Sequence, residues 1–188
     1  MRGKATPKKA LSVLIGKRLS IWRRASTMLT VQFGSVCREG DKSWGEYALH
    51  IDCPWRLLRH GRIFTGREDL FEPRILKRHF DWDKWANENW HDNLMEAIVL
   101  SVLKGVDKKT RSIENTRRIL TVTKVDVSAL GDLRIHMTGG FCLETFAEGT
   151  DTEFWRLLDW NKERHHVLRA RRRTRPTKGF TVGATARR

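Results

Sequence analysis

Apolar and polar residues alternate along several short stretches of this chain, which is the pattern of half-buried β-strands. The clearest stretches are Met28–Phe33, with Leu29, Val31 and Phe33 on one face, and Tyr47–Ile51, with Tyr47, Leu49 and Ile51 on one face. Similar patterns predict strands at 19–23, 55–58, 62–65, 119–127, 133–137 and 141–146, and a last apolar stretch covers 154–160.

One long segment has the periodicity of an amphipathic helix instead. A helix is predicted over His91–Leu103, because its apolar residues fall on one stripe, namely Leu94, Ala97, Ile98 and Val102. Gly105 stands where a glycine commonly ends a helix. Residues 107–118 are polar, and we expect them to form an exposed connection. Ala10–Ile15 has the pattern of a second, short helix.

Short turns separate the predicted strands. Thr138, Gly139 and Gly140 lie between the strands at 133–137 and 141–146, as in a β-hairpin, and Gly34 and Gly40 mark a loop after Met28–Phe33. Short connections favour antiparallel pairing over parallel crossover units. We therefore predict an α+β fold, mainly an antiparallel curled sheet or small sandwich of about seven strands with one main helix.

The formal net charge of +15 is concentrated at the two ends of the 188-residue chain. Residues 1–27 hold eight Lys and Arg and no acid, and residues 161–188 hold ten Lys and Arg and one acid. The remaining 28–160 carry 19 basic and 21 acidic residues, so this part is nearly neutral. We expect a basic disordered tail at 1–9, a single α+β domain at 10–160 and a basic C-terminal extension at 161–188.

The cysteines and the lengths of the apolar runs indicate where in the cell the protein is located. Cys37, Cys53 and Cys142 lie far apart and form no CxxC pair, which argues against a disulfide framework and for a reducing environment. No run approaches the roughly 20 apolar residues that a transmembrane helix needs. Leu11–Ile15 is too short for the core of a signal peptide. We expect a cytoplasmic protein with no membrane partner.

His50 and Asp52 are the first candidates for chemistry. They are two residues apart on one predicted strand, so they share its polar face. This spacing can begin a metal site, which would need a third ligand from elsewhere in the chain. The solvent-facing side of a half-buried strand explains the pair equally simply, and we favour that interpretation.

A second group of acidic residues precedes the predicted helix, and it comprises Asp81, Asp83, Glu88, His91 and Asp92. Such a group can bind a divalent cation or supply an acid–base pair, but it can also cap a helix beside an exposed loop, which we favour. No Gly-rich phosphate loop, HExxH or GxSxG pattern occurs in the sequence. We therefore expect no metal and no cofactor, and we lean towards a protein that is not an enzyme.

Two further clusters are candidates for binding. Trp82, Trp85 and Trp90 lie within nine residues and do not form one helical face, so they are either part of the core or an interface. The C-terminal extension contains a compact basic run that could contact nucleic-acid phosphates or could simply be a solvated tail, and its arginines are Arg169, Arg171, Arg172, Arg173 and Arg175.

Several blocks of this sequence resemble an uncharacterised family of bacterial proteins. The blocks are RRASTMLTVQFG at 23–34, WGEYALHIDCPWRLLRHGRIFTGREDLF at 44–71 and FDWD at 80–83. Asp52 stands where the family pattern has Gln, and Arg67 where it has Ser. The segment LRIHMTGGFCLETFAEGTDTEFWRLL at 133–158 resembles the sheet ending of the same group, and it is also similar to small β-rich, immunity-like bacterial proteins. The resemblance covers about residues 10–160 and implies no particular activity.

Three functions follow from these patterns, in order of preference. The first is a non-enzymatic protein-interaction module, immunity-like or defence-accessory, which binds a protein partner through its aromatic residues. The second is a nucleic-acid-associated protein that uses its basic terminal segments without sequence specificity. The third is a hydrolase or metal enzyme in which His50 and Asp52 would meet the acidic group at 81–92 in one cleft.

Overall fold

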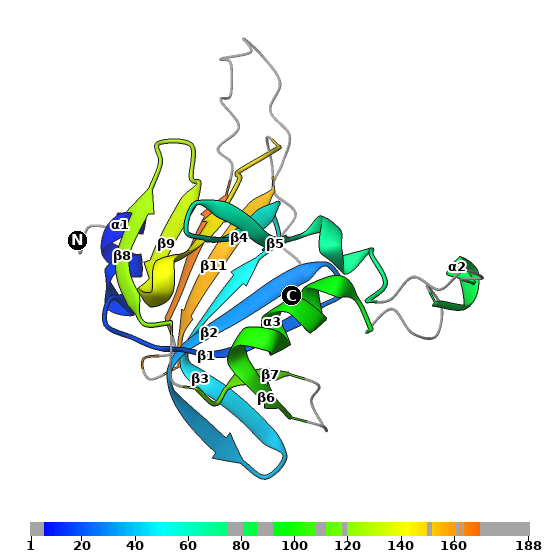
Figure 1. Cartoon of the computed structure of the whole chain (residues 1–188). Helices are drawn as coiled ribbons and strands as arrows, with labels where there is room; N and C mark the ends of the chain where they lie inside the picture. Colours follow the sequence, from blue (N-terminus) through cyan, green and yellow to red (C-terminus); the bar gives the residue numbers. More distant parts are fainter. Residues whose placement is uncertain are drawn as a thin grey trace, which may run out of the picture.

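Antiparallel strands in two sheets make up most of the computed structural model (Figure 1). Its described residues are 6–74, 81–85, 92–107, 112–117, 120–149, 152–160, 162 and 164–169. The expected α+β class with antiparallel pairing is confirmed. The expected count of about seven strands is too low, because the described residues form twelve strands.

The larger sheet has seven strands in the order β12-β11-β3-β2-β1-β7-β6. They are β1 (Leu19–Ala25), β2 (Met28–Glu39), β3 (Lys42–Ile51), β6 (Lys104–Val106), β7 (Ile113–Asn115), β11 (Glu153–Asp159) and β12 (Arg164–Arg169). Every neighbouring pair is antiparallel. Strand β12 lies within the segment that the sequence assigns to the C-terminal extension, so the paired structure continues past residue 160.

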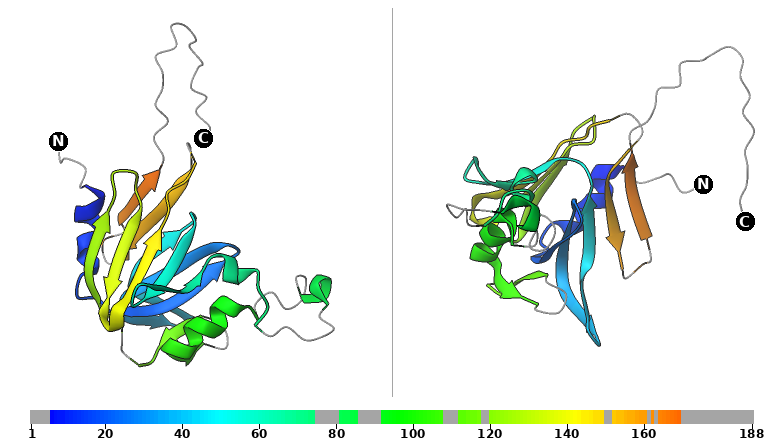
Figure 2. Two further views of the ribbon diagram at one scale, coloured as in Figure 1. Left: turned by 45° about the horizontal axis from the view of Figure 1, so that its top comes forward. Right: turned by 90° about the vertical axis from the view of Figure 1, so that its right-hand side faces the viewer.

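The smaller sheet has five strands in the order β5-β4-β10-β9-β8. They are β4 (Trp55–Arg59), β5 (Arg62–Gly66), β8 (Val122–Val127), β9 (Leu133–Met137) and β10 (Phe141–Thr145). Its pairs are also antiparallel, and the hairpin predicted between β9 and β10 is present. Figures 1 and 2 show this sheet lying against the larger one, with α1 (Pro7–Leu11) beside β8.

The chain passes from the larger sheet to the smaller one around Pro54. Strand β3 ends at Ile51, and β4 begins at Trp55 in the smaller sheet, one residue after Pro54. The backbone N–H groups of Asp52 and Cys53 both donate to the Phe154 carbonyl of β11, at 3.1 and 3.4 Å. Proline has no N–H to donate to a neighbouring strand, so no hydrogen bond from Pro54 is lost when the chain changes sheet there.

A single apolar core lies between the sheets. The predicted inward faces of β2 and β3 are confirmed, since Leu29, Val31, Phe33, Tyr47, Leu49 and Ile51 are all buried in it. Its largest side chains include Trp22 and Trp155. The Trp155 indole nitrogen donates to the Gly131 carbonyl at 2.9 Å, so the core aromatics also have their polar groups satisfied.

The main helix, α3 (Leu94–Leu103), contacts β5, β6 and β7 at one end of this core. It begins later than predicted, because Asn93 caps it and its side chain accepts a hydrogen bond from the Glu96 N–H at 2.9 Å. Lys104, with φ of 68°, takes the left-handed C-cap that the sequence indicated for Gly105. The buried residues of α3 are Met95, Val99 and Leu103, whereas the predicted stripe is only partly buried at Leu94, Ala97, Ile98 and Val102.

Two loop predictions were wrong. The chain does not turn at Gly34, because β2 continues through a bulge there to Glu39, with Gly34 at φ of +87°. Part of the expected exposed connection at 107–118 is strand β7, in which Ile113 and Asn115 are buried. Three residues carry too little alternation to reveal a strand. No helix within the described residues is long and apolar enough to cross a bilayer.

Candidate functional site: two exposed surfaces

Two of the three clustered tryptophans pack against each other at the short helix α2 (Trp82–Lys84), where Trp85 is the C-cap. Trp82 is 49% exposed, and its ring packs edge-to-face on Trp85 with centroids 6.2 Å apart. The Asp81 side chain caps the helix by accepting from the Lys84 N–H at 2.9 Å. Figure 1 and the left view of Figure 2 show α2 standing apart from both sheets. Trp90 lies outside the described residues.

The Trp85 side chain ties this pair to the start of the main helix. Its indole nitrogen donates to the Asp92 carbonyl at 3.4 Å, and Trp85 is only partly exposed. Trp82 is the more exposed partner, with charged and exposed residues on both sides at Asp81 and Asp83. The arrangement is an aromatic surface with a polar surround, which is the composition of many protein interfaces.

His50 and Asp52 lie elsewhere, on and just beyond β3. In the sheet register His50 stands between Thr30 of β2 and Arg156 of β11, and it is partly exposed, whereas Asp52 is exposed at the crossing between the sheets. Asp81 and Asp83 belong to α2, away from β3 (Figure 1). No group of three His, Cys, Asp or Glu within the described residues could hold a metal ion.

The basic run is described only at its first member. Arg169 ends β12 and pairs in register with Glu153 of β11. Arg171, Arg172, Arg173 and Arg175 lie outside the described residues, so nucleic-acid binding by this run stays a prediction.

A second surface, which the sequence analysis missed, covers the outer side of the five-stranded sheet. Arg56 of β4, Glu144 of β10, Arg134 of β9 and Asp126 of β8 are consecutive cross-strand neighbours, so positive and negative charges alternate across the strands. Arg56 donates through Nε and Nη2 to Glu144 Oε2, at 2.8 and 2.7 Å. The Arg134 Nε lies 3.0 Å from Glu144 Oε1.

Glu144 forms ion pairs with both arginines of this surface. Its side chain is only 8% exposed, whereas those of Arg56 and Arg134 are 38% and 63% exposed. Each of its two oxygens therefore holds one arginine, and burying the carboxylate is compensated by two charge-assisted contacts. The Arg56 guanidinium also lies 4.9 Å from the centre of the Phe146 ring, which fixes it from the other side.

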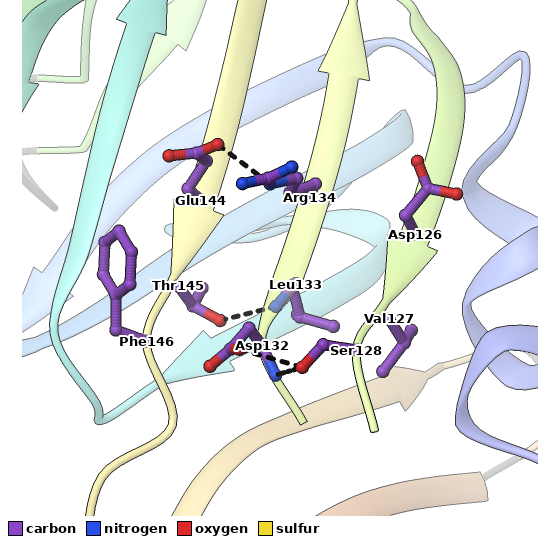
Figure 3. A pocket seen from close by; sticks show the side chains of 9 residues that line it. All are labelled: Asp126, Val127, Ser128, Asp132, Leu133, Arg134, Glu144, Thr145 and Phe146. Atoms are coloured by element: carbon purple, nitrogen blue, oxygen red, sulfur yellow. Dashed lines mark hydrogen bonds and ion pairs between the residues drawn. The ribbon is translucent and has the colours of Figure 1, made fainter. Parts of the chain in front are cut away.

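An open cleft of about 330 Å³ lies beside Glu144 (Figure 3). Arg134 and Glu144 line it together with Asp126, Asp132 and Phe146. The Asp132 carboxylate is used internally, because it accepts from the Ser128 hydroxyl and from the Ala147 N–H, both at 2.8 Å. Each of the two Asp132 carboxylate oxygens therefore already accepts one hydrogen bond.

Two lysines offset the charge of Asp126, the third acidic residue that lines the cleft. The hydrogen bond and charge of Lys124, 2.6 Å away, together with Lys8, lower the pKa of Asp126 below its ordinary value. Lys8 lies 3.6 Å and the His136 ring nitrogen 3.5 Å from the same carboxylate. Asp126 is therefore ionised at neutral pH, and its charge is offset by its neighbours.

The thiol on this face is not suited to nucleophilic chemistry. Burial, followed by the charge of Glu144, raises the pKa of Cys142 to about 11. Burial likewise raises the pKa of Cys53. Both thiols are therefore protonated at neutral pH, and a protonated thiol is a poor nucleophile.

Comparisons with protein-family models, with curated proteins and with solved structures found no match for this chain. The geometry of the two surfaces therefore carries the functional argument.

Proposed function

We propose that this chain is a non-enzymatic protein-interaction module, of the immunity-like or defence-accessory kind. The observation that supports it is the edge-to-face pair at α2, in which Trp82 is exposed and Trp85 partly exposed, outside the core. An exposed tryptophan costs solubility without adding to the core, and tryptophan is among the residues most enriched at binding hot spots.

The pair has the physical properties of an anchor. Trp85 is held by its bond to the Asp92 carbonyl and Trp82 by the Trp85 ring, so little rotamer freedom is lost when a partner covers them. Trp82 would bury the exposed half of its large apolar surface on binding, and the exposed charges of Asp81 and Asp83 would form the rim.

The test compares two equally exposed tryptophans. Trp160, at 47% exposure in the turn after β11, is the matched control for Trp82. We expect Trp82→Ala to weaken retention of the specific partner by about 30-fold or more, as for a hot-spot residue, and Trp160→Ala to leave it within about twofold. Retention is measured by quantitative mass spectrometry after purification of the full chain from its source cells, with nuclease treatment.

Two results would reject the proposal. Equal losses for both variants would show a non-specific apolar effect, and partner loss on nuclease treatment would indicate nucleic-acid bridging instead. The immunity-like role makes a further demand, namely that the captured protein inhibits growth when it is produced alone. Co-production of the unmodified chain should restore growth, and co-production of the Trp82→Ala chain should not.

A further inference from the structure

The arginine pair on the outer face of the five-stranded sheet has unused hydrogen-bonding capacity. Arg134 contacts Glu144 through Nε, and Arg56 through Nε and Nη2, so the other guanidinium N–H groups have no partner among the described residues. An arginine carries five N–H donors in a planar fork. Two guanidinium groups therefore flank the buried Glu144 carboxylate, and each retains N–H donors that have no partner among the described residues.

We propose that this arginine pair binds a carboxylate group of an acidic protein segment, with the side chain of that segment entering the cleft beside Phe146. The site is separate from the tryptophan pair and does not depend on it. It is a second contact surface, and its ligand is defined by charge and shape.

Preorganisation is the first argument. A free surface arginine loses side-chain conformational entropy when it is immobilised. Here the buried Glu144 already holds both guanidiniums, and the Phe146 ring lies under one of them. A ligand that binds this pair meets donors that are already fixed, so more of the interaction free energy appears as affinity.

Charge complementarity selects the ligand. Two guanidiniums and the Glu144 carboxylate leave a single positive charge, which one carboxylate neutralises. A phosphate dianion would exceed that charge beside Asp132, which lines the same cleft. Phe146, 40% exposed, offers an apolar surface to the methylene groups that precede a Glu or Asp carboxylate. Figure 3 shows the Arg134 guanidinium turned towards Glu144, with Asp126 on the other side.

The test uses a soluble acidic probe and two arginine variants. The full-length protein is titrated with an N-acetylated octaglutamate peptide and, in a separate arm, with inorganic phosphate, while the arginine Nε–H signals are followed by NMR at fixed ionic strength. Arg134→Gln removes one fork. Arg38→Gln is the control, because Arg38 has similar exposure, at 58%, forms an ion pair with Glu114 at 2.7 Å, and lies on β2.

We expect the peptide to shift the Arg56 and Arg134 signals, and Arg134→Gln to weaken binding by about tenfold, the worth of one charge-assisted contact. Arg38→Gln should stay within about twofold. Equal weakening by both variants, unmoved arginine signals, or tighter binding of phosphate than of the peptide would each overturn the proposal. Circular dichroism confirms that both variants are folded. A negative result here would leave the Trp82 comparison unaffected, since that comparison concerns α2.

Discussion

Two tryptophan pairs in this protein have similar ring geometry and opposite surroundings. Trp22 packs edge-to-face on Trp55 in the core, with ring centroids 5.5 Å apart, and its indole nitrogen donates to the Met95 sulfur at 3.2 Å. Trp82 packs edge-to-face on Trp85 in α2, at 6.2 Å. Trp22 is 1% exposed, whereas Trp82 is 49% exposed.

The buried pair stabilises the fold, whereas we propose that the surface pair binds a partner. The first pair joins β1 to β4 and contacts α3, so it links both sheets and the main helix. Within the described residues, the second pair links α2 to Asp92, the residue before the N-cap of α3. Removing a side chain from the first pair opens a cavity, and removing one from the second exposes no core.

The largest expected effect comes from substituting the buried member. Trp22→Ala should lower the free energy of unfolding by about 3–5 kcal/mol, because it leaves a cavity at the junction of the sheets. Trp82→Ala should change it by less than about 0.5 kcal/mol. Guanidinium unfolding followed by far-UV circular dichroism measures both, without relying on tryptophan fluorescence. Similar losses for the two variants would break the comparison.

A smaller effect is expected from a glycine inside β2 of the larger sheet. A Cβ at Gly34 would lie 2.5 Å from the Glu46 Oε2 and 2.7 Å from its Cβ, at a φ of +87°. Gly34→Ala should therefore cost about 2–4 kcal/mol through overlap and backbone strain together. Gly16→Ala is the control, since Gly16 has a φ of +80° and nothing within 4 Å of the added Cβ, and it should cost only about 1–2 kcal/mol. If both cost the same in urea unfolding, packing against Glu46 is unimportant.

The smallest effect concerns the half-buried thiol. The raised pKa of Cys142, about 11 against an ordinary value near 9, means that folding favours the protonated form. Its contribution to stability is fully present below about pH 9 and is lost as the pH rises through about 11. The urea midpoint should therefore fall less between pH 8.5 and 10.5 in Cys142→Ala than in the unmodified chain. An identical fall in both would contradict the assignment.

Labelling rates provide an independent measurement of the same thiol. Iodoacetamide at pH 8 should modify the exposed Cys37 at least about tenfold faster than Cys142, because only the thiolate reacts and burial restricts access. Peptide mass spectrometry over time gives both rates. Faster modification of Cys142 would show that its environment does not suppress the thiolate.

Side-chain periodicity predicted the faces of β2 and β3 because each strand is long enough for several alternations. It could not predict β7, whose three residues pair between β1 and β6, or the bulge at Gly34, where an added Cβ would meet Glu46 of β3. These features follow from tertiary contacts rather than from local pattern.

The two candidate surfaces differ in the same way. The cluster of tryptophans was visible in the sequence, since Trp82 and Trp85 are close along the chain. The cluster of Arg56, Arg134 and Glu144 was not visible in the sequence, because Arg56 lies 88 positions from Glu144. Arg134 and Glu144 fall within predicted strands, but only the register between β4, β10 and β9 brings the three residues together.

The most direct test of the central claim places a photoreactive phenylalanine analogue at position 82, or at position 160 as the control, in the full chain produced in its source cells. Our account predicts one discrete covalent adduct with a protein partner from position 82 and none from position 160, because only Trp82 belongs to the binding surface. The absence of an adduct at position 82, or the same adduct from both positions, would contradict it.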